Sequence, residues 1–132
     1  MIKPLKILVI ENEPNLLSLY RFNIESWSLP IDLKTAKDGY DGLLLVGSWQ
    51  PDVIISDLQM PNSDGFHMLN ILAKKDFIKN TSIIVITDLS REDIKEHEAL
   101  PDGLTVYTKP IPFAKIEEQV KLCLENISDN EN

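Results

Sequence analysis

The stretch DVIISDLQMPNSDG, residues 52–65, decides the fold of this chain. Its first half is an apolar run, residues 53–55, that leads to the carboxylate of Asp57, and its second half, residues 61–65, is rich in turn-forming residues. A short run of β-branched residues bounded by turn signals predicts a strand that is buried on both faces. In open parallel sheets, ligands bind beyond the carboxyl ends of the strands. Asp57 is therefore the first candidate for chemistry.

The rest of the chain alternates short apolar runs with segments of helical periodicity. The predicted strands cover residues 5–10, 31–36, 52–57, 82–87 and 104–108, and the predicted helices cover about 14–27, 39–50, 65–75, 90–100 and 112–127. In the first helix, Tyr20 lies on the expected core face; in the second, the expected core stripe is Tyr40, Leu43, Leu44 and Gly47. Five strands alternating with five helices indicate a parallel, doubly wound α/β sheet with both faces covered.

Length and composition fit a single globular domain. The chain has 132 residues, of which 43% are hydrophobic and 26% are charged, and this is enough to bury one full core. We expect one domain over residues 1–127 and a frayed polar tail over residues 128–132. No apolar run approaches the roughly 18–20 residues that span a bilayer, and the apolar stretch near the N-terminus is too short for a signal peptide. These features predict a cytoplasmic protein without a membrane partner.

Charge and cysteine content narrow the function further. Thirteen basic residues against 21 acidic ones give a net charge of −8, which argues against direct binding of nucleic acid, because such binding needs cations to neutralise phosphates. The single cysteine, Cys123, excludes an internal disulfide and a cysteine-cluster metal site. Its helical spacing among apolar residues indicates a small core residue.

Polar residues also close three other predicted strands. Glu11, Asn12 and Glu13 follow the first strand, Thr87 and Asp88 end the fourth, and Thr108 and Lys109 end the fifth. All these ends lie on one edge of a parallel sheet, so one crevice would hold two or three carboxylates, a hydroxyl and an ammonium. Close like charges resist joint ionisation. A divalent cation with oxygen ligands relieves this repulsion, and Mg²⁺ suits a wet site that also holds phosphate.

Four sequence blocks resemble those of bacterial two-component response-regulator receiver domains of the chemotaxis-receiver kind. They are ILVIENEP, IISDLQMPNSDG, IIVITD and VYTKPI, and they stand in order, each at a predicted strand end. The likeness covers about residues 5–126. Asp57 and Thr87 are 30 residues apart, and Thr87 and Lys109 are 22 apart, as the family pattern requires. The resemblance implies a flavodoxin-like, five-stranded parallel sheet of order 2-1-3-4-5 with five helices.

The resemblance also implies a function and a set of site residues. Asp57 would accept a phosphoryl group from a histidine kinase or a phosphotransfer protein, Lys109 and Thr87 would contact phosphoryl oxygens, and a cis Lys109–Pro110 peptide would aim the amine. A Mg²⁺ ion would be held by Glu11, Asn12, Asp57 and the backbone carbonyl of Gln59. Phosphorylation would change the surface formed by the fourth helix, fifth strand and fifth helix. Such a protein is no enzyme, apart from its own phosphorylation by small donors and its own dephosphorylation.

Three residues depart from the family pattern. Asn12 stands where receivers usually carry an acid that binds Mg²⁺, so we expect Mg²⁺ to bind weakly. Asp88 stands where a small residue is usual; we favour an exposed cap near the fourth helix, and a charge at the pocket mouth that slows phosphotransfer is the alternative. Val106 replaces the usual aromatic switch residue, and strand alternation should send Tyr107 to the other face.

These departures leave a second function open, namely a receiver-like interaction module that works without phosphorylation. An aspartate phosphatase is disfavoured because Gln59 replaces the general acid that turnover needs. A nucleotide-binding enzyme is disfavoured because the ENEPN turn, residues 11–15, has no glycine. The chain would act alone on a downstream protein or within a longer protein with an output domain, and a homodimer through the fourth and fifth helices is compatible with the sequence.

Overall fold

The computed structural model describes residues 3–60, 63–74, 80–95, 100–101 and 103–130. It contains a five-stranded sheet of order β2-β1-β3-β6-β7 in which every neighbouring pair is parallel. Counted within this sheet, the order is 2-1-3-4-5, as expected. The strands are β1 (Leu5–Ile10), β2 (Ile31–Ala36), β3 (Val53–Ser56), β6 (Ser82–Thr87) and β7 (Thr105–Thr108).

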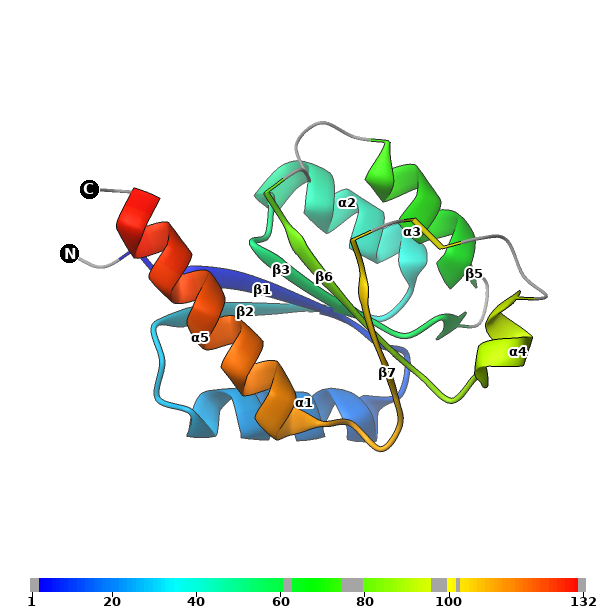
Figure 1. The fold of residues 1–132 in the computed structure, drawn as a ribbon, viewed down its shortest axis with the longest axis horizontal. Coiled ribbons are helices and arrows are strands. Elements are labelled where there is room, and N and C mark those ends of the chain that lie inside the picture. The colour runs from blue at the N-terminus through cyan, green and yellow to red at the C-terminus, as the bar shows by residue number, and fades with distance from the viewer. Residues whose placement is uncertain (1–2, 61–62, 75–79, 96–99, 102, 131–132) are drawn as a thin grey trace.

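The helices cover both faces of the sheet (Figure 1). They are α1 (Pro14–Ser26), α2 (Gly39–Trp49), α3 (Gly65–Ala73), α4 (Arg91–Lys95) and α5 (Phe113–Asn130). Helices α1 and α5 lie on one face, and α2 and α3 lie on the other. Helix α5 continues three residues past the expected boundary, through part of the segment assigned to the tail, whereas residues 131–132 lie outside the described residues.

The central strands are largely apolar because both of their faces are covered. Strand β3 is buried at every position, whereas the edge strands β2 and β7 alternate between more and less exposed residues. This is the pattern expected for a parallel sheet packed between two helix layers. Alternate side chains of β1 and β3 enter two separate cores, one under α1 and α5 and the other under α2 and α3.

Helix α2 packs through a face that agrees with the predicted one only at Leu43. Its buried residues are Gly39, Gly42 and Val46, whereas Tyr40 is 64% exposed and Leu44 is 71% exposed. The prediction was wrong for Tyr40, Leu44 and the exposed Gly47, whereas Leu43 packs against the core as predicted. The helix carries apolar residues on nearly all sides, so periodicity did not single out its buried face. A Cβ atom on Gly42 would lie 2.6 Å from Ile10 Cδ1. The glycine side of the helix can therefore approach the sheet more closely than a leucine side could.

Two local predictions concern helix starts. Pro14 opens α1, where its missing N–H costs no hydrogen bond. At α4, the Asp93 N–H donates to Ser90 Oγ at 3.0 Å and the Ser90 N–H donates to Asp93 Oδ2 at 3.4 Å, which confirms the predicted capping box.

A small antiparallel pair, β4 (Gln59–Met60) with β5 (Ser63–Asp64), was not expected from the sequence. It begins two residues after Asp57, close to the end of β3.

Candidate functional site

The candidate site lies at the carboxyl edge of the sheet. Glu11 follows β1, Asp57 follows β3, Thr87 is the last residue of β6, and Lys109 follows β7. The parallel registers of the four strands bring these ends together. Glu11, Asp57 and Thr87 are all buried, at 2%, 6% and 0% exposure. Buried polar side chains gain nothing from apolar packing, so their gathering at one edge of the sheet indicates a functional site.

Both carboxylate oxygens of Asp57 accept hydrogen bonds. Its Oδ2 accepts a hydrogen bond from Lys109 Nζ at 2.8 Å, and its Oδ1 accepts one from the Gln59 N–H at 3.0 Å. The Asp57 N–H donates to the Ile10 carbonyl at 3.4 Å, which continues the β1–β3 pairing by one residue. The carboxylate therefore sits at the end of the central strand with a cation on one oxygen and a backbone amide on the other.

Lys109 is the cation of the site. Burial disfavours its charge, but the hydrogen bond and the charge of Asp57 outweigh this effect, so the pKa of Lys109 is raised above its ordinary value. The ammonium is therefore protonated at neutral pH. Its Nζ also lies 3.8 Å from Asp88 Oδ2. The Lys109–Pro110 peptide is cis, as the resemblance implied.

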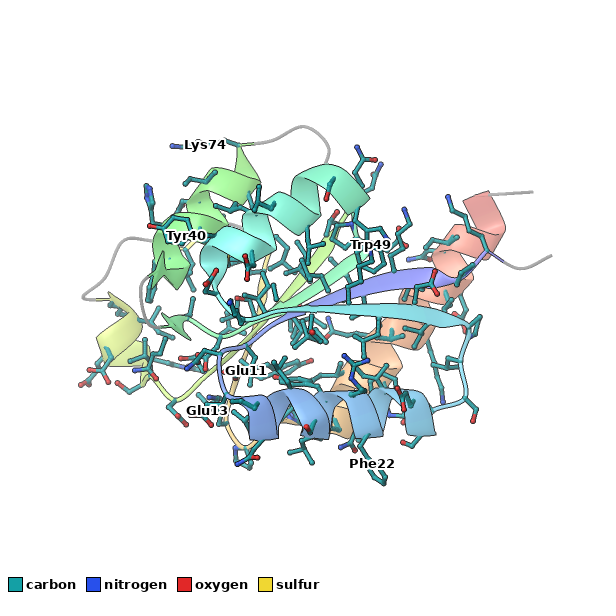
Figure 2. The ribbon with its side chains drawn as sticks, turned by 180° about the vertical axis from the view of Figure 1, so that it is seen from behind. Glu11, Glu13, Phe22, Tyr40, Trp49 and Lys74 are labelled. Carbon is teal, nitrogen blue, oxygen red and sulfur yellow. The ribbon has the colours of Figure 1, made fainter. Side chains whose placement is uncertain are left out.

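Glu11 is turned toward its own loop. Its Oε2 accepts hydrogen bonds from the Asn12 N–H at 2.8 Å and the Glu13 N–H at 3.2 Å. Burial raises its pKa, the charge of Asp57 adds to this, and the backbone donors and Lys109 offset only part of the increase. Figure 2 shows Glu11 beside the strand ends and Glu13 at the start of α1. Glu11 thus adds a second carboxylate to the site and also shapes the β1–α1 loop.

Thr87 presents a hydroxyl at the same edge. Its Oγ1 accepts a hydrogen bond from the Leu89 N–H at 3.1 Å, and its carbonyl accepts one from the Lys109 N–H at 2.9 Å. A threonine hydroxyl that accepts one bond can still donate its proton to an anion. This backbone hydrogen bond between Lys109 and Thr87 also positions Lys109 relative to the end of β6.

The oxygen donors at this edge fit a Mg²⁺ ion. Glu11 and Asp57 carry carboxylates, Asn12 carries a side-chain amide and Gln59 has a backbone carbonyl, and these are the groups that would hold the ion. Hard oxygen donors with few charges suit an ion that keeps several of its waters. Among the described residues, no group of three or more His, Cys, Asp and Glu side chains is arranged to hold a metal. A Mg²⁺ ion held by these residues would take its remaining ligands from water and from phosphoryl oxygens.

Two neighbours of the site were not identified from the sequence. Ser56 is buried and its hydroxyl donates to the Asp57 carbonyl at 3.0 Å. Tyr20 of α1 is buried, and its pKa is raised by that burial and by the charges of Glu11 and Asp57. The sequence placed Tyr20 on a core face, but only the packing of α1 against the sheet brings it near the two acids.

Asp88 fits the expectation of an exposed residue, since it is 66% exposed. The α4 capping bond, however, comes from Ser90 Oγ. The Asp88 carboxylate faces Lys109 instead, at the 3.8 Å distance given above. The sequence indicated that position 88 is unusual, because receivers usually carry a small residue after the threonine. The conformation of the loop was needed to show that Asp88 contacts Lys109.

The side chains of β7 alternate as predicted. Tyr107 packs in the core under α1 and α5, and its hydroxyl donates to Gln119 Oε1 at 3.0 Å. Val106 is 39% exposed on the opposite face, in the wall of a cavity of about 420 Å³ together with Ile94 and Leu100. No aromatic side chain of β7 therefore fills the space between this strand and α4.

The comparison with curated proteins finds several relatives that are longer than this chain. The chain is 29% identical over 127 residues to a protein-glutamate methylesterase/protein-glutamine glutaminase of Koribacter versatilis, covering 96% of the chain and 33% of the relative. It is 28% identical over 120 residues to the transcriptional regulator RpaA of Synechocystis, covering 90% of the chain and 48% of the relative. The chain thus spans about a third to a half of these two relatives.

Solved receiver domains share the fold. The receiver domain of the Francisella response regulator 1452 superposes with a TM-score of 0.76 at 29% identity, covering 92% of this chain and 98% of that one. The chemotaxis protein CheY4 of Vibrio cholerae superposes with a TM-score of 0.75 at 22% identity, covering 91% of this chain and 98% of that one. The second likeness supports the fold alone.

The search of protein-family models gives a match that covers most of the chain. The model of the response regulator receiver domain matches residues 7–121. This range contains Glu11, Asp57, Thr87 and Lys109. Within the part of the chain that the structure describes, no helix is long and apolar enough to cross a membrane. The chain belongs to the family of response regulator receiver domains of two-component systems, in which phosphorylation on an aspartate is expected.

Proposed function

We propose that this chain is a phospho-accepting signalling domain in which a histidine kinase or a phosphotransfer protein phosphorylates Asp57. The observation that supports this most directly is the 2.8 Å contact between Lys109 Nζ and a buried Asp57 oxygen, at the edge where Thr87 and Glu11 also end. The Lys109 cation would lower the repulsion between the Asp57 carboxylate and an anionic phosphoryl donor, and a carboxylate is a known nucleophile for forming an aspartyl phosphate.

In the proposed step, one Asp57 oxygen attacks the phosphorus of phosphohistidine. A P–O bond to Asp57 forms, the P–N bond to the donor breaks, and the imidazole leaves with the bonding electron pair. The product on this chain is an acyl phosphate. Phosphoryl transfer depends mainly on alignment and on charge stabilisation. Lys109 would release Asp57 Oδ2 and pair with a phosphoryl oxygen, and Thr87 would donate its hydroxyl to another.

A bound Mg²⁺ would supply positive charge for the phosphoryl oxygens. Glu11, Asn12, Asp57 and the carbonyl of Gln59 are the residues proposed to hold it. The formal charge of the two acids and Lys109 is −1, compared with −2 if position 12 carried an acid, so weak binding is expected. The Gln59 N–H already donates to Asp57 Oδ1, and this bond keeps the residue close to the nucleophile.

The output would be a change in the surface of α4, β7 and α5. Thr87 is linked through its hydroxyl to the Leu89 N–H, just before α4, and through its carbonyl to the Lys109 N–H. Movement of Thr87 toward a phosphoryl group would therefore act on both loops. The partner would be a downstream protein or an output domain, and a cytoplasmic location is part of the same proposal.

Intact-mass measurement after incubation with phosphoramidate and Mg²⁺ tests the proposal. We expect a gain of one phosphoryl mass in the wild-type chain, lost in Asp57→Ala and kept in Asp52→Ala. Asp52 is the matched control because it precedes the same strand at the opposite edge. No mass gain with phosphoramidate, acetyl phosphate or a phosphorylated phosphotransfer protein would contradict the proposal. That outcome would favour the phosphorylation-independent interaction module, which Asn12, Asp88 and Val106 also allow.

A further inference from the structure

Asp88 places a carboxylate at the mouth of the site. Its Oδ2 lies 3.8 Å from Lys109 Nζ, the same atom that contacts Asp57 at 2.8 Å. Asp88 is 66% exposed and Lys109 is 18% exposed, so this carboxylate is the solvent-exposed neighbour of a largely buried ion pair. The ammonium is thus shared by one buried and one exposed acid.

The backbone around Asp88 holds it in that position. On one side, Thr87 is the last residue of β6 and is fully buried. On the other side, the Leu89 N–H donates to Thr87 Oγ1 at 3.1 Å, which closes a tight turn around Asp88. Ser90, and not Asp88, caps α4. The carboxylate is therefore free of a capping role and is directed by its turn toward the cation of the site.

A negative charge at this point would affect phosphoryl donors differently, because the donors and their leaving groups differ in charge. Acetyl phosphate is a dianion at neutral pH and releases acetate, an anion. Phosphoramidate is a monoanion whose nitrogen is protonated, and it releases neutral ammonia. Phosphohistidine resembles phosphoramidate, because its phosphorus is also bound to a nitrogen. A carboxylate near the leaving group therefore repels the acyl donor and its product but attracts a protonated nitrogen.

We propose that Asp88 is a specificity-determining residue that favours P–N phosphoryl donors over anionic acyl phosphates at Asp57. This inference rests on the proposed function. In the favoured reaction, the Asp57 Oδ–P bond forms, the P–N bond breaks, and nitrogen retains the electron pair. The charge of Asp88 would thereby reduce phosphorylation of this domain by small acyl phosphates and keep Asp57 available to its protein donor.

The expected change in donor preference can be estimated from the interaction of one unit charge, that of Asp88, with a donor several ångströms away. At an exposed position the interaction is weakened by water and by salt. We expect the ratio of acetyl phosphate rate to phosphoramidate rate to rise about threefold to tenfold when Asp88 loses its charge. Because screening reduces the interaction, this rise should shrink at high ionic strength.

The experiment compares initial phosphorylation rates of wild type and Asp88→Asn with both donors, at saturating Mg²⁺ and at low and high salt. Asparagine keeps the shape of the side chain, and the ratio of the two rates cancels any change in Mg²⁺ affinity. Asp32→Asn is the matched control, since Asp32 is an exposed residue near the amino end of β2. It should leave the ratio unchanged.

The outcomes separate this inference from the proposed function. A ratio that rises in Asp88→Asn and not in Asp32→Asn supports a local role for the Asp88 charge. An unchanged ratio in Asp88→Asn, or an equal rise in Asp32→Asn, overturns the inference while phosphorylation itself persists. Absence of phosphorylation in every variant with phosphoramidate, with acetyl phosphate and with a phosphorylated phosphotransfer protein overturns the proposed function and this inference together.

Discussion

The two sides of the site are held by different kinds of contact. On the side formed by β1 and β3, backbone N–H groups hold the acids: Asn12 and Glu13 donate to Glu11, and Gln59 donates to Asp57. On the side formed by β6 and β7, a side-chain cation holds the site together, because Lys109 contacts both Asp57 and Asp88. Backbone donors are fixed by the fold, whereas an ion pair between side chains can be exchanged.

This difference assigns separate tasks to the two sides. The β1–β3 side keeps two carboxylates in place despite their mutual repulsion, and the β6–β7 side supplies the groups that can change partners. A phosphoryl group on Asp57 would have to attract Lys109 away from its present carboxylate oxygen. Four changes test how far the two sides are separate, from the largest expected effect to the smallest.

Lys109→Met removes the cation of the β6–β7 side. We expect phosphorylation to slow by about 10²–10³-fold, the usual loss when one preorganised donor to a developing anion is removed. Initial rates with phosphoramidate, measured by intact mass, provide the test. Lys121→Met is the matched control, because Lys121 forms an exposed ion pair with Glu117 at 3.3 Å. Equal rates for the two variants would show that the cation is dispensable.

Gly65→Ala disturbs the backbone of the β1–β3 side. An added Cβ would lie 2.6 Å from the Leu58 carbonyl oxygen and 2.8 Å from Leu58 Cα, which are backbone atoms that cannot rotate away. We expect the free energy of unfolding to fall by about 1–3 kcal/mol, as measured by urea denaturation. Gly47→Ala should instead be neutral or stabilising, since a Cβ added there would meet nothing within 4 Å. A stable Gly65→Ala variant would mean that the loop beside Asp57 is loosely packed.

Asn12→Asp restores a third acid beside Glu11 and Asp57. We expect Mg²⁺ to bind about three- to tenfold more tightly, because the affinity of oxygen sites rises with the charge of their ligands. Calorimetric titration measures this directly. Asn15→Asp is a suitable control, since Asn15 is an exposed residue of α1. An unchanged affinity in Asn12→Asp would show that position 12 takes no part in metal binding.

Glu11→Gln removes one of the two charges held by the backbone. Burial raises the pKa of Glu11 in the folded chain, so the stability that its neutral form gives is present below its unfolded pKa of about 4.3 and is lost as the pH rises through the folded value. Without Mg²⁺, we expect the variant to match wild type near pH 4. At pH 7 it should be about 1 kcal/mol more stable, because its amide oxygen can still accept the two N–H groups.

Denaturation curves between pH 4 and pH 8 give the measurement for Glu11. Glu118→Gln on the exposed side of α5 serves as the control and should show no such trend. If Glu11→Gln were less stable than wild type at pH 7, the charge of Glu11 would be contributing to stability. The backbone donors would then outweigh burial on this side of the site.

Much of the framework was predicted from local patterns. Strands β1, β2 and β6 have the predicted bounds, because β1 and β6 are largely apolar runs, β2 alternates between apolar and polar residues, and turn signals stand at their ends. The prediction failed for the rotation of α2, where Tyr40 and Leu44 are exposed. The run Leu43 to Val46 is apolar at four positions in a row. Periodicity alone could not choose a face, and the close approach of Gly42 to Ile10 decided it.

In the site, too, some features were predictable from the sequence and others depend on the tertiary structure. The sequence determined which side chains stand at the strand ends, because a parallel sheet places the ends of its strands on one edge whatever the loops do. Only the tertiary structure decided what each one contacts: Glu11 turns to its own backbone, Tyr20 lies near the acids, and Lys109 is shared by Asp57 and Asp88. These contacts depend on the paths of loops and on helix packing, which bring together residues that are far apart in the chain and that no local pattern can pair.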